Sequence, residues 1–264
     1  MNDSSCEVVD LDVVIIACDN ERTIARTLEC MDGYVNRILV IDSGSRDGTV
    51  EIARGSGAEV IFHEWEGHVK QKQFALEQCS AGWVLSLDSD ESVDDELRGE
   101  ILRAVGEDDA GVAGYEVNRR IFFLGKWLRY TFQPEWRLRL VRRDGAHWEG
   151  YDPHDKLVAD GGEVRRLPGV LRHDSWADVS DLVRSQVGHG LHAAESYHRI
   201  GRKGSLLKLF VSPAAALFKQ LILRRGFLDG WRGVVVAFGA SVGVSAKCLR
   251  LIELGGTHSS DGKR

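Results

Sequence analysis

Four short apolar runs that alternate with helix-like stretches constrain the fold of this chain more than any other feature. The runs occupy residues 12–17, 37–41, 58–62 and 83–87, and the clearest helical patterns between them occupy residues 20–31 and 68–79. Strands that alternate with helical patterns are typical of βαβ units and a parallel sheet. The sequence therefore predicts an α/β fold with a mostly parallel sheet.

Acidic residues follow three of these predicted strands. Asp88 and Asp90 directly follow the fourth run, Asp42 follows the second, and Asp19 and Glu21 follow the first. In an open α/β sheet, the carboxyl ends of the strands face the crevice where ligands bind. Charges there are usually paired or bound to a metal, and carboxylates suit Mg²⁺ or Mn²⁺. A lone Asp-x-Asp is more often an acidic loop before a helix, but three acidic sites at one edge favour a nucleotide crevice.

The common phosphate-binding glycine motifs are absent from the sequence. Neither G-x-G-x-x-G nor G-x-x-x-x-G-K-[ST] occurs anywhere in the chain. The glycines of those motifs let a backbone loop approach the phosphates closely. Dinucleotide binding and P-loop chemistry therefore lose their main support.

Three segments resemble the inverting glycosyltransferases of family 2, which have the GT-A fold. They read Ala-Cys-Asp-Asn-Glu at 17–21, Ile-Asp-Ser-Gly-Ser-Arg-Asp-Gly-Thr at 41–49 and Leu-Asp-Ser-Asp-Glu at 87–91. Four more segments resemble the branch that adds sugars to the lipopolysaccharide core: Gln-Lys-Gln-Phe-Ala at 71–75, Glu-Trp-Arg-Leu-Arg-Leu at 135–140, Pro-His-Asp-Lys at 153–156 and Gly-Phe-Leu-Asp-Gly at 226–230. The resemblance covers residues 11–254, nearly the whole chain.

The resemblance implies a metal-dependent hexosyltransferase whose donor is a nucleotide sugar such as UDP-glucose. The acceptor it implies is an envelope glycan or a lipid-linked saccharide such as the lipopolysaccharide core. It assigns Asp90 to the divalent ion, Mg²⁺ or Mn²⁺, Asp88 to the ion or the ribose, and Asp42 to the nucleoside. Asp19 and Glu21 are expected to line the same pocket.

The other candidates for the donor side each have an ordinary structural alternative. Lys72, and also Lys70, are candidates to contact the phosphates or the donor sugar, although a Lys on a helix is usually exposed. His173 is a candidate to complete the metal shell, as a late His does in some GT-A enzymes, whereas a lone His is more often a hydrogen-bonding residue. On the acceptor side, Arg137 and Arg139 share one face of a predicted strand and are candidates to hold an acceptor phosphate or diphosphate, whereas alternation alone predicts that both are exposed.

The expected general base is Asp155. It stands in a His-Asp pair where the family branch usually has His-Glu, and a positioned carboxylate suits the removal of a proton from an acceptor hydroxyl. Its side chain is one methylene shorter than that of Glu, so Glu135 is the alternative base.

Length and cysteine usage fit one cytosolic enzyme. We expect an N-terminal tail at 1–10, a catalytic GT-A domain at 11–178, a helical membrane-adjacent region at 179–254 and a disordered tail at 255–264. The five Cys form no C-x-x-C pair, and the N-terminus is polar and acidic. These features predict reduced thiols and no signal peptide.

The C-terminal part is basic, whereas the rest of the chain is acidic. Residues 199–264 carry 12 Lys and Arg against 3 Asp and Glu, a net charge of +9, and residues 1–198 carry 22 against 37, or −15. The longest uncharged piece, 233–246, is 14 residues long, short of the ~20 that span a bilayer. Basic residues between apolar stretches favour helices lying on an anionic membrane, here the inner face of the cell membrane. The alternative is a helical hairpin packed on the catalytic domain.

Other function classes fit the sequence less well. A nucleotidyltransferase would normally carry a glycine-rich loop with Arg or Lys after its first strand, which residues 17–21 lack. A non-catalytic carbohydrate- or membrane-binding scaffold has no need of Asp88, Asp90 and a base. Nucleic acid is not expected as a partner, because the basic segment has no recognisable binding fold. The sequence leaves the oligomeric state open.

Overall fold

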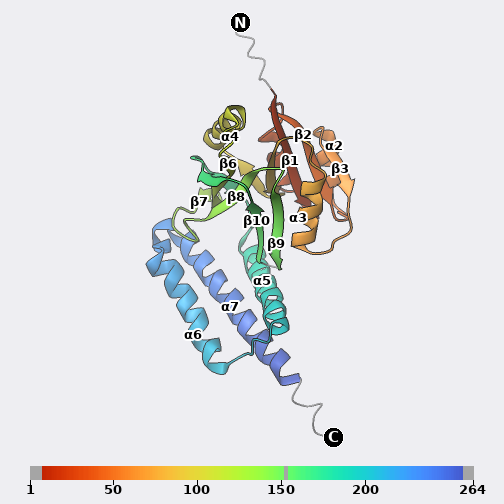
Figure 1. Ribbon diagram of the computed structural model, residues 1–264. Helices are drawn as coiled ribbons and strands as arrows, with labels where there is room; N and C mark the ends of the chain where they lie inside the picture. Colours follow the sequence, from red (N-terminus) through yellow and green to blue (C-terminus); the bar gives the residue numbers. More distant parts are fainter. Residues whose placement is uncertain (1–7, 152–153, 258–264) are drawn as a thin grey trace. The chain divides into compact units, whose positions relative to one another are not determined.

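The computed structural model describes residues 8–151 and 154–257, which divide into two compact units (Figure 1). The first unit comprises residues 1–119, 135–150 and 155–174, and the second comprises 120–134, 151–154 and 175–264. The two units therefore interleave along the chain, whereas the sequence expectation placed one boundary near residue 178. Most of the two predicted tails, residues 1–7 and 258–264, lies outside the described residues, but residues 255–257 continue a helix.

The first unit alternates strands and helices as the sequence predicts. Its elements are β1 (Val9–Ala17), α1 (Ile24–Glu29), β2 (Val35–Asp42), α2 (Thr49–Gly55), β3 (Glu59–Phe62), α3 (His68–Glu77), β4 (Trp83–Asp88), β5 (Glu91–Val93), α4 (Asp95–Glu107), β6 (Val112–Phe123), β8 (Trp136–Arg142), β9 (Ala146–Tyr151), β10 (His154–Ala159), β11 (Glu163–Arg166) and β12 (Leu171–His173). The first predicted helix is shorter than expected, because residues 20–23 form a turn before α1.

The main sheet has the strand order β3-β2-β1-β4-β8-β6-β12-β5. The strands from β3 to β4 are parallel, whereas β8 runs antiparallel to both of its neighbours, β4 and β6. The expected α/β fold with a mostly parallel sheet is thus confirmed. The parallel half brings the carboxyl ends of β1, β2 and β4 to one edge, where the acidic residues lie.

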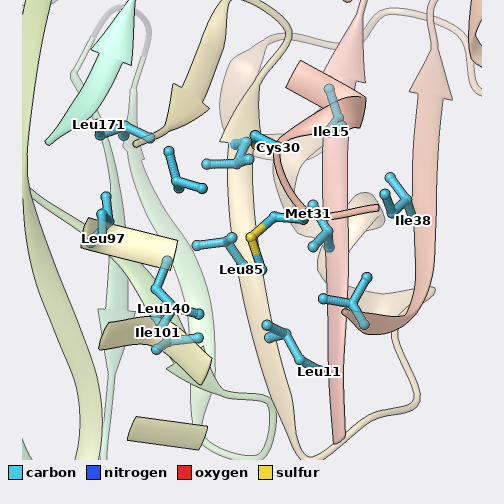
Figure 2. Close-up of a cluster of buried hydrophobic side chains, with 14 of the residues drawn as sticks. Leu11, Ile15, Cys30, Met31, Ile38, Leu85, Leu97, Ile101, Leu140 and Leu171 are labelled. Atoms are coloured by element: carbon cyan, nitrogen blue, oxygen red, sulfur yellow. The ribbon is translucent and has the colours of Figure 1, made fainter. Parts of the chain in front are cut away.

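Helices cover both faces of this sheet. Side chains that alternate along β1 reach opposite faces: Leu11 and Ile15 pack in the cluster drawn in Figure 2, and Val14 packs in a second cluster on the other face. Leu97 and Ile101 of α4 lie in the first cluster (Figure 2), which also includes residues of α1 and α2. On the other face, α3 packs through Ala75 and Leu76 against β1 and β2. This two-sided burial fixes the strand ends that carry the polar residues.

The second unit is mainly helical. It contains β7 (Lys126–Trp127), α5 (Val179–Arg199), α6 (Leu206–Phe218), the π-helical turn η1 (Lys219–Leu223), the 3₁₀ turn η2 (Gly226–Asp229) and α7 (Trp231–Thr257). Figure 1 shows α7 between α5 and α6, and α7 packs against both. The contact with α5 is very close, because a Cβ on Gly190 would lie 2.2 Å from the carbonyl oxygen of Gly243. Only glycine fits there.

Two segments of this unit are long and apolar enough to cross a membrane, judged by length and composition alone. They are Leu206–Leu223 and Trp231–Gly255. The sequence expectation measured the apolar stretches by their uncharged length, of which 233–246 is the longest, but the helix containing it runs for 27 residues. Basic residues near the ends of these helices interrupt the uncharged stretches, so each uncharged stretch is shorter than the helix that contains it.

Candidate active site

The register of the sheet brings two of the acidic strand ends next to each other. Asp42, the last residue of β2, pairs with Ala17 of β1, and Asp88, the last residue of β4, pairs with Ile16. The two aspartates therefore lie on either side of the end of β1. Three loops leave the sheet at this edge, and of the predicted site residues Asp19 and Glu21 lie on the loop after β1 and Asp90 on the loop after β4.

The carboxylates on the β1 and β2 side order a backbone loop. Asp42 accepts hydrogen bonds from the backbone N–H groups of Gly44 and Ser45, at 2.9 and 3.1 Å. Asp19 and Glu21 accept from N–H groups further along the same loop, at 2.7 and 2.9 Å. These three predicted nucleotide-binding residues thus hold the loops after β1 and β2 together.

Lys72 of α3 joins two predicted site residues from different parts of the chain. Its ammonium lies 3.0 Å from Asp88 and 2.9 Å from Asp155, and 4.7 Å from the centre of the Trp148 ring. The exposed position expected of a helical Lys is wrong here, because Lys72 is only 7% exposed, whereas Lys70 is exposed. Burial alone would raise the pKa of Asp155, but the ammonium of Lys72 holds that pKa below its usual range.

Two arginines link Asp88 to a further carboxylate, that of Glu91. They lie at the Asp88 oxygen that Lys72 does not contact. Arg139 donates to Asp88 at 2.7 Å and to the fully buried Glu91 at 2.6 Å, and Arg119 donates to Glu91 at 3.2 Å. Although burial opposes it, the positive charge of Arg139, with those of Lys72 and Arg119, keeps the pKa of Asp88 well below its usual range. The expectation that Arg139 is exposed is wrong, since it is 4% exposed; Arg137 is largely exposed, as alternation predicts.

Glu135, the alternative base, is held by guanidinium groups. Arg119 and Arg137 each donate to its Oε1 at 2.7 Å. Burial alone would raise the pKa of Glu135, but these two arginines lower it to about 2. A carboxylate with so low a pKa, and with its oxygens engaged, is a poor proton acceptor near neutral pH.

Asp90 and His173 form the predicted metal-binding pair. The Asp90 carboxylate lies 3.3 Å from Nε2 of His173, and the backbone N–H of Asp174 donates to the carbonyl oxygen of Asp90. Burial would raise the pKa of Asp90, but the neighbouring imidazole lowers it. Within residues 8–151 and 154–257, no group of three or more His, Cys, Asp or Glu side chains forms a complete metal site. The protein offers a partial ligand set, such as Mg²⁺ uses when substrate phosphates complete its shell.

Sequence reasoning missed the network of Glu91, Arg119 and Arg139. One signal was present: Glu91 directly follows the Asp-x-Asp pair and opens a strand whose residues are all buried. A buried carboxylate requires a cationic partner. The partners could not be named from the sequence, because Arg119 and Arg139 lie 28 and 48 residues further along the chain.

Glu91→Gln is expected to lower the free energy of unfolding by about 3–5 kcal/mol, because it leaves the buried Arg139 and the partly buried Arg119 without their shared anion. Urea denaturation of the purified variant measures this. The matched control is Glu100→Gln on α4, where Glu100 pairs with the exposed Arg103. Its expected cost is below about 1 kcal/mol. An equal loss of unfolding free energy in the two variants would show that the buried network stabilises the fold no more than an exposed ion pair does.

Comparison with known proteins agrees with this geometry. The sequence model of the family described as glycosyl transferase family 2 matches residues 12–158, more than half of the chain. The matched segment includes most of β1, all of β2 to β4 and most residues of the site. The chain belongs to glycosyltransferase family 2.

Similar proteins extend the relationship beyond the matched segment. An uncharacterized glycosyltransferase of Rickettsia typhi is 30% identical over 251 residues, covering 91% of this chain and 85% of that protein. The lipopolysaccharide core biosynthesis glycosyltransferase LpsC of Rhizobium meliloti is 28% identical over 247 residues, covering 86% and 89%. Among solved structures, a mannosyltransferase of Pyrobaculum calidifontis, in complex with GDP-Man and Mn²⁺, superimposes with a TM-score of 0.52 at 15% identity, covering 92% of this chain and 88% of that one. This last likeness shows that the family-2 glycosyltransferase shares the GT-A fold.

Proposed function

We propose that this glycosyltransferase moves a hexose from a nucleotide sugar, UDP-glucose by family resemblance, to an envelope glycan or a lipid-linked saccharide. We also infer that the transfer inverts the anomeric carbon. The observation that carries the proposal is the convergence of Lys72, Asp88 and Asp155 beside the Asp90–His173 pair at one sheet edge. The similarity to LpsC supports an acceptor of the lipopolysaccharide core type.

We place the divalent ion on Asp90, with His173 completing the protein's share of the ligands. A carboxylate and an imidazole already 3.3 Å apart suit Mn²⁺, and Mg²⁺ needs only one or two carboxylates besides phosphates. Asp88 is held by Arg139 and Lys72, so it supports the ion or the ribose rather than supplying the first ligand. When bound, the ion neutralises negative charge that develops on the departing diphosphate.

We assign the nucleoside side of the pocket to the loops after β1 and β2. There Asp19, Glu21 and Asp42 fix the backbone by accepting hydrogen bonds. Lys72 lies 3.0 Å from Asp88 at the end of β4 and 2.9 Å from Asp155, so we assign its ammonium to the donor phosphates. It thereby adds positive charge where the leaving group carries negative charge.

We propose Asp155 as the general base. Its partner is the ammonium of Lys72, which the incoming diphosphate would also attract. Sharing that ammonium weakens its hold on Asp155 and brings the pKa of Asp155 nearer to its usual range, because the cause of the lowering is Lys72 itself. Glu135 has two guanidinium partners and a pKa of about 2, which suits a structural role.

We further propose that the enzyme works in the cytoplasm at the inner face of the cell membrane. A lipid-linked acceptor is held there, and the net charge of +9 on residues 199–264 complements an anionic lipid surface.

A screen of nucleotide sugars, with Mn²⁺, with Mg²⁺ and with a chelator, tests the proposed activity. We expect release of the nucleotide diphosphate from the true donor and thermal stabilisation by that donor only when an ion is present. A ligand at one hundred times its Kd stabilises the native state by about 2.7 kcal/mol. If no nucleotide sugar is hydrolysed or raises the melting temperature, the chain is a non-catalytic scaffold.

A further inference from the structure

The helix α6 exposes an apolar face along its whole length. None of its residues is buried within the structure, and in the segment Leu206–Leu223 only 6% of the residues are. The exposed large apolar side chains on this segment are Leu206, Leu207, Phe210, Val211, Phe218, Ile222 and Leu223. Phe210, the most exposed of them, is 75% exposed. Soluble proteins rarely leave so large an apolar patch in water.

The apolar surface continues onto the neighbouring elements of the same unit. Trp231, Phe238, Val242 and Leu249 are exposed on α7, at spacings of seven, four and seven residues that place them on one helix face. Phe227 and Leu228 are exposed on η2, the turn between α6 and α7. We call the exposed apolar residues of α6, η1, η2 and α7 named in this and the preceding paragraph the apolar surface.

Basic residues border this surface, and acidic residues are absent from its main helix. Lys208 and Lys219 lie eleven residues apart on α6 and at the start of η1, so they share one side, about 16 Å from each other. Arg224 and Arg225 follow in the turn, and the segment 206–223 has no Asp or Glu. Long basic side chains at the ends of an apolar helix reach lipid headgroups while their stems stay in the apolar layer.

The third helix of the unit, α5, carries charged side chains, whereas the exposed face of α6 is apolar. It packs along α7, on the side away from α6 in Figure 1, and carries Arg184, Glu195 and Arg199. Arg250 of α7 forms an ion pair with Glu195 at 3.3 Å. A hairpin of α6 and α7 that crossed a bilayer would carry these charges of α5 into the hydrocarbon layer, where they are strongly disfavoured.

We propose that the apolar surface is embedded in one leaflet of an anionic membrane, with α5 on the water side, and that neither α6 nor α7 crosses the bilayer. The proposal rests on the proposed location at the membrane and adds which helices enter the lipid and how deeply. Lipid fits this surface better than a second copy of the chain. A two-fold pairing of this face centred on Lys208, on Lys219 or midway between them would bring two lysines together.

Liposome binding of matched variants tests which face enters the lipid. Wild type should bind liposomes of mixed zwitterionic and anionic lipid and stay bound at about 1 M salt, where the Debye length falls to about 3 Å. Phe210→Glu should weaken binding at least about tenfold, since it puts a charge in place of a large apolar group that is expected to enter the lipid. Leu191→Glu, at an exposed apolar site on α5, is the matched control and should bind like wild type.

Thiol labelling tests the topology in the same liposomes. Lys203→Cys lies before α6 and Arg224→Cys lies in the turn after it, in a background in which Cys6 and Cys18 are serine. A membrane-impermeant maleimide added outside sealed liposomes should label both sites. Protection of either site until the liposomes are opened would overturn the proposal in favour of a spanning helix.

Other outcomes of these experiments also decide whether the apolar surface enters the lipid. Equal binding by Phe210→Glu and Leu191→Glu, or a wild type that stays in solution, would overturn the proposal. If light scattering then showed a dimer that Phe210→Glu dissociates, the surface would be a contact between copies. Donor hydrolysis without liposomes should be the same in all these variants, so failure of the membrane proposal is distinguishable from failure of the proposed activity.

Discussion

Asp90→Asn is expected to lower metal-dependent turnover by at least about 100-fold while the protein stays folded. Loss of a residue that merely orients a metal ligand already costs about 10- to 100-fold, and Asp90 is the proposed ligand itself. Asparagine keeps the shape of the side chain but loses the charge that attracts the ion. Donor hydrolysis measured over a series of Mn²⁺ concentrations should show both a lower maximum and a higher Mn²⁺ requirement.

The matched control for this variant is Asp95→Asn. Asp95 lies in the same part of the chain, at the start of α4, but it is 91% exposed by its side chain and pairs only locally, with Arg98. It should keep full turnover and an unchanged Mn²⁺ requirement. If Asp90→Asn behaves like Asp95→Asn, the ion is held elsewhere.

Asp155→Asn is expected to lower kcat by about 10²- to 10⁴-fold with little change in the affinity for the nucleotide sugar. The base takes its proton only as the new bond forms, so its loss affects the transition state more than the bound ground state. Single-turnover transfer to a saccharide acceptor, together with donor binding measured by calorimetry, separates the two effects.

Glu135→Gln is the matched comparison, and a different defect is expected. The pKa of Glu135 is about 2 in the folded protein, because of Arg119 and Arg137, against about 4.3 for an unperturbed Glu. Its ionised form therefore stabilises the fold above about pH 4.3, and this stabilisation is lost as the pH falls toward 2. Glu135→Gln should lower stability at neutral pH and leave kcat within about tenfold of wild type. A crippled kcat in Glu135→Gln with normal kcat in Asp155→Asn would reverse the assignment of the base.

Much of the fold followed from local pattern. The four apolar runs became β1 to β4, and the acidic residues after three of them meet at one edge because parallel strands share their direction. Local reasoning was less successful where a side chain could meet a distant partner. For Lys72 it left an exposed position open as the ordinary alternative, and for Arg139 it favoured exposure, yet both are buried against carboxylates.

The sequence by itself determined the α/β class, the family and the positions of the acidic strand ends. These depend on short-range spacing, which sets which residues face the core and which follow a strand. Only the tertiary structure decided the charge partners. Lys72 and Asp155 are 83 residues apart, and Arg139 reaches Glu91 across 48 residues. Such pairs form because a buried charge needs an opposite charge within a few ångströms, and that distance is set by how the strands and helices pack.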